Sequence, residues 1–236
     1  MEPETRDELE IPYFWKQNHA RWKHPFRMRV VGPSQVGKTY FVMNILENCQ
    51  QLIAPAPTKI YWAFGEKNEK QMKTIQQRSP LPVHFIEGLP DASDFSPDEI
   101  NLLIMDDLMT DSANSKTVSN LFTRSSHHRN MSVILMLQNL FPKGPAFRDA
   151  FLNSTYDILF ANIHDRRQIK LLALKLFPEN PEYFIDAFEQ ATAYPHKYLQ
   201  VSYDQHTPLD LRLSGGFFPP EIPIHYIPKK SLTRRK

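Results

Sequence analysis

The hydrophobic and polar positions of this chain alternate between short, strongly apolar runs and longer polar or amphipathic stretches. Runs such as 102–107 and 132–137 are almost continuously apolar, which is typical of strands buried on both faces of a parallel sheet. We predict strands at 26–31, 59–64, 83–87, 102–107, 132–137, 156–161 and 198–202, and helices at 40–51, 68–78, 115–125, 166–177 and 182–190. Because strand and helix alternate, we expect an α/β fold: a doubly wound, mainly parallel sheet with helices on both faces.

The 236 residues suffice for one such domain with short appendages. We expect the domain at 26–205, an amphipathic lead-in at 1–25, and an extended, proline-rich arm with a basic tail at 206–236. The first ten residues are strongly acidic, and the tail from Lys229 to Lys236 is strongly basic. A basic tail suits nucleic-acid contact or nuclear targeting, and a merely solvated end is an equally good interpretation.

Composition limits the cellular context. The chain has one cysteine, Cys49, which excludes an internal disulfide and a cysteine-based zinc site and fits the reducing cytosol or nucleus. The start, Met1–Glu4, lacks the features of a secretory signal, and we expect no membrane span because no apolar run approaches about 18 residues.

One motif carries a definite chemistry. Residues Gly32–Thr39 match G-x-x-x-x-G-K-[ST], directly after a predicted strand and before a predicted helix. Two glycines let the backbone turn its N–H groups toward phosphates, and the helix N-terminus adds partial positive charge. Lys38 is expected to reach the β- and γ-phosphates, and the Thr39 hydroxyl to bind Mg²⁺. The alternative is a Gly-Lys-Thr turn ahead of an ordinary helix.

The motif therefore predicts ATP and Mg²⁺ as ligands. The expected nucleotide-binding residues are Gly32, Pro33, Ser34, Gln35, Val36, Gly37, Lys38, Thr39 and Tyr40.

Two acids end the strand predicted at 102–107. A carboxylate at the end of a buried strand is unfavourable unless it is paired or binds metal. Asp106 is the expected Mg²⁺ ligand, directly or through water, and Asp107 is expected to orient the attacking water or accept its proton. The alternative is that both acids cap the next segment.

The next strand ends in Gln138, which could hydrogen-bond both the γ-phosphate and the water. The loop before that strand, 124–130, is basic, and we expect it at the same edge of the sheet. Arg124 or Arg129 could stabilise transition-state charge in a neighbouring subunit's site. The alternative for Gln138 is an amide that hydrogen-bonds loop backbone. The alternatives for the basic loop are a solvated loop and a contact with a phosphate backbone. His127 and His128 have no third ligand at metal spacing, so zinc is not expected.

These stretches resemble a known family. Gly32–Thr39, Leu102–Asp107 and Ser126–Phe141 are similar to the FtsK–HerA superfamily of DNA-pumping P-loop ATPases, and most similar to the poxvirus-type genome-packaging ATPases. Relatives of these occur in large DNA viruses, virophages, adintoviruses and Polinton/Maverick elements. The resemblance continues through 157–162, 171–178, 198–201 and 211–213, and its most specific part is His-His-Arg-Asn before a strand ending in Gln-Asn.

The resemblance implies a homo-oligomeric ring with ATP sites between subunits, a glutamine sensor and an arginine finger in trans. These roles carry over to Gln138 and to Arg129 or Arg124. The implied activity is ATP hydrolysis that drives double-stranded DNA, bound independently of sequence, into a preformed capsid. The implied partners are capsid or portal-vertex proteins. The implied location is the host nucleus, the cytoplasm or the virion. Family members often have Glu where Asp107 stands, and the shorter side chain would hold the water less closely.

Candidate DNA contacts are Arg166 and Arg167 with Lys170, or Lys143 with Arg148, although a solvated helix face would look the same. Other functions stay open. One is a helicase or DNA-mobilising ATPase of the same fold. Another is a nucleotide-dependent interaction switch with weak turnover. A nucleoside kinase would need an arginine-rich lid and an acceptor site, and neither is evident.

Overall fold

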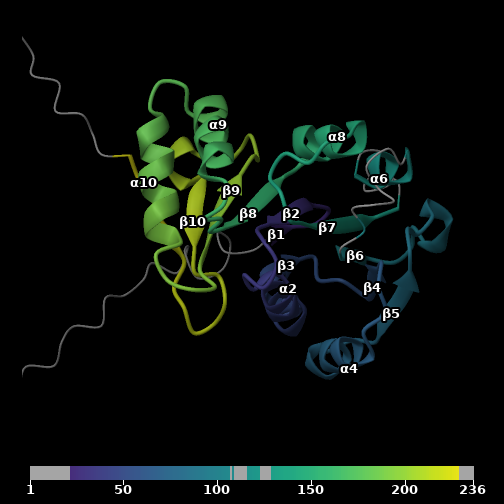
Figure 1. Cartoon of the computed structure of the whole chain (residues 1–236). Coiled ribbons are helices and arrows are strands. Elements are labelled where there is room, and N and C mark those ends of the chain that lie inside the picture. Colours follow the sequence, from purple (N-terminus) through teal and green to yellow (C-terminus); the bar gives the residue numbers. More distant parts are fainter. Residues whose placement is uncertain (1–21, 107, 109–115, 123–128, 229–236) are drawn as a thin grey trace, which may run out of the picture.

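The computed structural model describes residues 22–106, 108, 116–122 and 129–228. In this part of the chain, nine strands form one sheet in the order β11-β10-β9-β8-β2-β7-β6-β4-β5, and β1 pairs with β3 separately (Figure 1). The strands of the large sheet are β2 (Arg27–Val31), β4 (Lys59–Phe64), β5 (Val83–Glu87), β6 (Asn101–Asp106), β7 (Met131–Leu137), β8 (Tyr156–Phe160), β9 (Tyr198–Ser202), β10 (Leu213–Gly215) and β11 (Ile224–His225). The small sheet consists of β1 (Trp22–Lys23) and β3 (Ile53–Ala54).

The six strands from β8 to β5 are parallel, whereas β9, β10 and β11 are each antiparallel to their neighbours. The predicted α/β fold with a mainly parallel sheet is therefore confirmed. β10 and β11 lie in the stretch after residue 205 that we expected to be an extended arm, and they widen the sheet at one edge. The division into lead-in, domain and arm stays a prediction.

Helices cover both faces of the sheet, as predicted (Figure 1). One face carries α2 (Lys38–Glu47), α3 (Cys49–Leu52) and α4 (Glu69–Arg78). The other carries α6 (Lys116–Asn120), α8 (Pro145–Asn153), α9 (Arg166–Leu176) and α10 (Pro181–Ala191). Within the described residues, no helix is long and apolar enough to cross a membrane.

α8 has no counterpart among the predicted helices. Its first residue, Pro145, follows Gly144 in a segment rich in turn residues, which hides the helix in a hydrophobic pattern. Proline is favourable there because the first helical N–H has no partner within the helix. Ala146, Phe147 and Ala150 are buried and attach the helix to the sheet.

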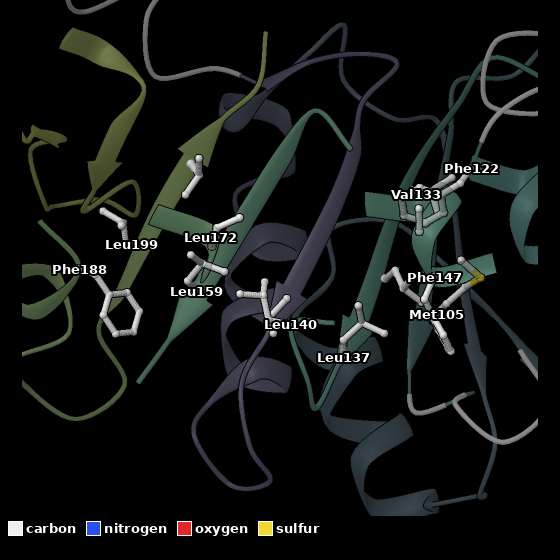
Figure 2. Packing of buried hydrophobic residues seen from close by; sticks show 14 of the residues in the cluster. Met105, Phe122, Val133, Leu137, Leu140, Phe147, Leu159, Leu172, Phe188 and Leu199 are labelled. Atoms are coloured by element: carbon white, nitrogen blue, oxygen red, sulfur yellow. The ribbon is translucent and has the colours of Figure 1, made fainter. Parts of the chain in front are cut away.

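The core on the α8–α10 face positions the strands (Figure 2). Leu159 of β8 and Leu199 of β9 lie beside Leu172 of α9, and Leu137 of β7 lies beside Phe147 of α8. Each such fully buried side chain stabilises the fold by about 1.5–3 kcal/mol relative to an exposed one. The packing fixes the positions of β7 and β8, and therefore of the loops that follow them.

A buried ion pair joins β2 to β8. Arg29 Nε donates to Asp157 Oδ1 at 2.8 Å, and Arg29 Nη2 donates to Asp157 Oδ2. Both side chains are fully buried, and the Tyr203 hydroxyl donates to Asp157 at 2.7 Å. Because an unpaired buried charge is strongly destabilising, this pairing accounts for an arginine inside an otherwise apolar strand.

Candidate nucleotide-binding site

The loop from Gly32 to Gly37 connects the carboxyl end of β2 to α2. Gln35 and Gly37 have φ angles of 64° and 110°, which turn successive N–H groups toward one concave side. The N-cap of α2 is Gly37, which has no side chain to accept hydrogen bonds from the first-turn amides. These amides and the helix dipole therefore favour an anion such as phosphate.

Contacts explain why both fixed positions of the motif are glycine. A Cβ on Gly32 would lie 2.8 Å from Cβ of Phe160 and 2.9 Å from Cγ1 of Val36. A Cβ on Gly37 would lie 2.9 Å from Nδ1 of His196, and the positive φ angle disfavours a side chain in any case. The backbone can follow this path only because neither residue has a side chain.

Lys38 places its ammonium group over the start of the loop. Its Nζ donates to the carbonyl oxygens of Gly32 at 2.6 Å and Pro33 at 2.7 Å. A flexible lysine held in this way provides a positive point charge at the concave side of the loop. This geometry suits the predicted contact with the β- and γ-phosphates.

His196, which was not predicted from the sequence, also contacts the loop. Its Nδ1–H donates to the Val36 carbonyl at 3.0 Å, although 160 positions separate the two residues. His196 is exposed and has a φ angle of 63° in the turn between α10 and β9. No local sequence signal could have found it, because the contact depends on how β9 is placed beside β8.

The other predicted residues meet the loop at the carboxyl edge of the sheet. β6 and β7 run parallel to β2, so residues at their carboxyl ends share its edge. A pocket of about 300 Å³ lies between the loop, Asp106 at the end of β6 and Gln138 just after β7. The residues that line it are Ser34, Gln35, Gly37, Lys38, Thr39, Tyr40, Asp106, Met136 and Gln138. The structure therefore brings these predicted residues together, while their chemical roles stay predictions.

A larger pocket of about 520 Å³ adjoins the first and shares Thr39 and Asp106 with it. It lies beside the start of α4, where Gln71 Nε2 donates to Asp106 Oδ2 at 3.1 Å. Gln71 was also not predicted. The only sequence feature that points to Gln71 is that it belongs to a polar helix following a strand that ends at the same edge of the sheet.

The other end of α4 is attached to α2. Arg78 Nε donates to Glu47 Oε2 at 3.2 Å, and its Nη2 donates to Asn44 Oδ1 at 2.5 Å. The guanidinium also lies 4.9 Å from the ring centroid of Tyr40. α4 therefore connects the helix that carries Lys38 and Thr39 to the strand that ends in Asp106.

Arg129 does not lie where we expected. Its backbone carbonyl accepts from Asn101 Nδ2 at 2.9 Å, and its Nη1 donates to the Phe95 carbonyl at 3.5 Å, both at the amino edge of the sheet. The seven residues of β7 separate this edge from Gln138, a length of about 20 Å. For Arg129, the prediction of a place at the same edge as Gln138 is therefore wrong, because a residue before a parallel strand lies opposite one that follows it. Arg124 and Asp107 lie outside the described residues.

The groups around the smaller pocket suit a phosphate chain with a divalent cation. Loop amides and Lys38 supply the positive side, while the Thr39 hydroxyl and the Asp106 carboxylate are the oxygen ligands that Mg²⁺ prefers. The helix start at Gly37–Lys38 adds an anion site built from backbone alone. These residues therefore fit Mg²⁺ and a nucleoside triphosphate.

Sequence comparisons find no match for this chain, either among family models or among curated proteins. Solved structures do match it. The DNA-packaging ATPase B204 from Sulfolobus turreted icosahedral virus is similar with a TM-score of 0.54 and 10% identity, over 78% of this chain and 96% of that one.

The genome packaging NTPase B204 from Sulfolobus turreted icosahedral virus 2 is also similar. Its complex with ATP-gammaS gives a TM-score of 0.52 at 13% identity, over 78% of this chain and 94% of that one. Its complex with AMPPCP gives a TM-score of 0.51 at 12% identity, over 78% of this chain and 95% of that one. At such identities the likeness shows the fold: this chain has the α/β architecture, with a mainly parallel mixed sheet, of these P-loop NTPases.

Proposed function

We propose that this chain is an ATP-driven translocase of double-stranded DNA that packages a viral or virus-like genome into a capsid. The observation that carries the proposal is that Lys38, Thr39, Asp106 and Gln138 line one pocket, at the carboxyl edge of a sheet with the fold of viral packaging NTPases. Phosphate binding, metal binding and a sensor amide are thereby available at one place.

In the proposed site, the amides of Gly32–Thr39 and the Lys38 ammonium bind the β- and γ-phosphates. Thr39 and Asp106 hold Mg²⁺, and Gln71 orients the Asp106 carboxylate. Bound Mg²⁺ supplies positive charge that neutralises the β- and γ-phosphate oxygens. Tyr40, in the first turn of α2, completes the nucleotide-binding set.

Hydrolysis requires an oriented water molecule. We assign Asp107 to orient that water and accept its proton, and Gln138 to hydrogen-bond both the water and the γ-phosphate. The transition-state charge is stabilised by Arg129 or Arg124 of a neighbouring subunit. Arg129 lies at the opposite edge of the sheet from its own pocket, so it can act only on a neighbour's nucleotide, which requires a ring or a similar head-to-tail assembly.

The direct test is the rate of ATP hydrolysis with and without double-stranded DNA of mixed sequence. We expect duplex DNA to increase the rate at least about tenfold, and Lys38→Ala or Asp107→Asn to reduce it by about 10²-fold or more, because each removes a group that stabilises the transition state. Lys70→Ala, a change of the same charge at an exposed position on α4, is the matched control and should keep the wild-type rate.

The other outcomes identify the competing functions. Nucleotide binding with hydrolysis that is slow and indifferent to DNA would contradict the motor and indicate an interaction switch. Transfer of phosphate to a small acceptor would indicate a kinase. Stimulation by single-stranded but not double-stranded DNA would indicate a helicase-type ATPase.

A further inference from the structure

α9 is a helix with only basic charges. Its eleven residues include Arg166, Arg167, Lys170 and Lys175 and no acid. Arg166, Arg167 and Lys170 are exposed, and their spacing of three and four places them on one face of the helix. The basic surface is local, because the next helix, α10, has three acids and no basic residue.

α9 begins at the nucleotide edge of the sheet. It follows β8, which runs parallel to β2, so Arg166 comes six positions after Phe160, the carboxyl end of a strand beside the phosphate loop. The basic face of α9 thus starts at the edge that also holds Lys38 and Gln138.

Two contacts attach α9 to the segment that follows Gln138. Gln168 Oε1 accepts from the backbone N–H of Leu140 at 2.8 Å, and Lys175 Nζ lies 4.6 Å from the ring centroid of Phe141. Gln168 is itself held by Asp165, whose Oδ2 accepts from Gln168 Nε2 at 2.7 Å. The backbone N–H of Leu140 is only two residues from Gln138, so a displacement of Gln138 would also move the group that binds α9.

The other side of Leu140 is attached to the phosphate-loop strand. Arg29 Nη1 donates to the Leu140 carbonyl at 3.0 Å, and its Nε and Nη2 donate to Asp157. The backbone of Leu140 thus has its carbonyl held by β2 and its amide held by α9. The Leu140 side chain is buried in the core shown in Figure 2, so the backbone has little room to move independently of its neighbours.

We propose that the exposed face of α9 binds the phosphate backbone of double-stranded DNA, and that the Gln138–Leu140–Gln168 connection couples this surface to the nucleotide. The proposal deepens the proposed function and rests on it. Gln138 responds to the γ-phosphate, Leu140 moves with Gln138, and Gln168 transfers the movement to the helix that carries Arg166, Arg167 and Lys170. Gln168 is a positioning residue, since it touches neither nucleotide nor DNA.

Duplex DNA is the partner that the charge pattern favours. Its phosphates present regularly spaced negative charge, which flexible basic side chains on one helix face neutralise without reading sequence. A motor that moves DNA of any sequence requires contacts of this kind.

The first experiment locates the DNA surface. Binding of a fluorescent duplex of about 30 base pairs is measured by anisotropy across a series of salt concentrations, with ATP-gammaS present. Arg167→Ala with Lys170→Ala should weaken binding at least about tenfold and reduce the slope of log affinity against log salt by about two, because each lost phosphate contact removes about 0.9. Lys70→Ala with Lys73→Ala, on exposed positions of α4, removes the same charge and should change neither value.

The second experiment tests the coupling. Duplex affinity is compared with ATP-gammaS and with ADP bound, and the ratio of the two measures how strongly nucleotide and DNA are linked. We expect a ratio of about 5 to 150 in the wild type and close to one in Gln168→Leu, which cannot accept from Leu140. Gln168→Glu keeps an acceptor oxygen for Leu140 but loses the donor to Asp165 and adds a like charge beside it, so it should keep only part of the ratio. Gln190→Leu, at an exposed position of α10, is the matched control.

A readout without DNA separates failure of this inference from failure of the proposed function. Hydrogen exchange of the α9 amides should differ between ATP-gammaS and ADP in the wild type and not in Gln168→Leu, while basal hydrolysis stays within about twofold. A wild type that responds to DNA, with Gln168→Leu responding equally, would overturn the coupling alone. Equal loss of binding in the α4 and α9 pairs would overturn the DNA surface alone. A wild type that neither binds duplex DNA nor is stimulated by it would overturn both proposals.

Discussion

His24 is half-buried between the amino ends of β2 and β7, with both ring nitrogens in hydrogen bonds. Its Nε2–H donates to Asn130 Oδ1 at 2.9 Å, and its Nδ1 accepts from the Ser132 hydroxyl at 2.6 Å. Burial disfavours the charged ring and lowers the pKa of His24 below 6.5, and the hydrogen bond to Asn130 offsets this only in part. The folded protein therefore binds a proton at His24 less readily than the unfolded chain does.

We expect His24 to lower the free energy of unfolding as the pH falls below 6.5. Above that pH the ring is neutral in both states and has no differential effect. Between the unfolded-state pKa and the lower folded-state pKa, only the unfolded chain gains the proton, and below both values the loss is complete. Urea denaturation at several pH values between 7.5 and 5 should therefore show a smaller decline for His24→Gln than for the wild type.

His164→Gln is the matched control, since His164 is exposed. It should decline with pH as the wild type does. If His24→Gln and the wild type lost stability in parallel, His24 would not be a source of the pH dependence.

At the scale of elements, α4 connects the two halves of the proposed Mg²⁺ site. One end reaches Asp106 through Gln71, and the other binds α2 through Arg78. Groups that orient a metal ligand commonly contribute 10–100-fold to metal affinity. The helix therefore holds together the two elements that carry Thr39 and Asp106.

Gln71→Ala should raise the Mg²⁺ concentration required for half-maximal ATP hydrolysis by about 10–100-fold. Binding of nucleotide without Mg²⁺ should be unchanged, because the phosphate loop is intact. Titration of Mg²⁺ at fixed ATP gives the Mg²⁺ requirement, and equilibrium binding in EDTA gives the nucleotide affinity without Mg²⁺. Gln77→Ala, exposed on the same helix, should behave as the wild type. A lower maximal rate with an unchanged Mg²⁺ requirement would contradict the role of Gln71.

Hydrophobic patterns and motifs predict many of the elements and part of the candidate site. Strands such as β4 and β9 occupy the predicted residues because strong apolar runs with turn residues at both ends leave few alternatives. The convergence of Lys38, Asp106 and Gln138 was predictable because carboxyl ends of parallel strands share one edge. Gln71 and His196 were not, since their contacts depend on how distant elements pack. The error on Arg129 came from placing a residue that precedes β7 at the edge where β7 ends.

At the scale of the whole molecule, Arg129 and the proposed nucleotide pocket lie at opposite edges of the sheet. A subunit that uses Arg129 in catalysis must therefore present it to another copy. In a closed ring, each pocket would then combine Lys38 of one subunit with Arg129 of the next.

Mixing two inactive variants tests this arrangement. Arg129→Ala and Lys38→Ala should each be inactive, whereas a mixture should regain hydrolysis, because about one quarter of the interfaces in randomly mixed rings join an intact pocket to an intact arginine. Lys38→Ala mixed with Asp106→Asn should stay inactive, since both changes affect the same side of the interface. No recovery in the first mixture would exclude Arg129 as the arginine that acts in trans.

The structure also constrains the order in which the chain can fold during its synthesis. Trp22 is buried near the beginning of the described chain, and its Nε1–H donates to Gln200 Oε1 at 2.8 Å across 178 positions. Its ring also packs 5.7 Å from that of Phe217. A nascent chain therefore cannot complete the native packing of this indole until β9 and Phe217 have left the ribosome, so this part of the core is completed only near the end of translation. In a variant with Trp15 and Trp62 replaced by phenylalanine, the fluorescence of Trp22 would report that moment.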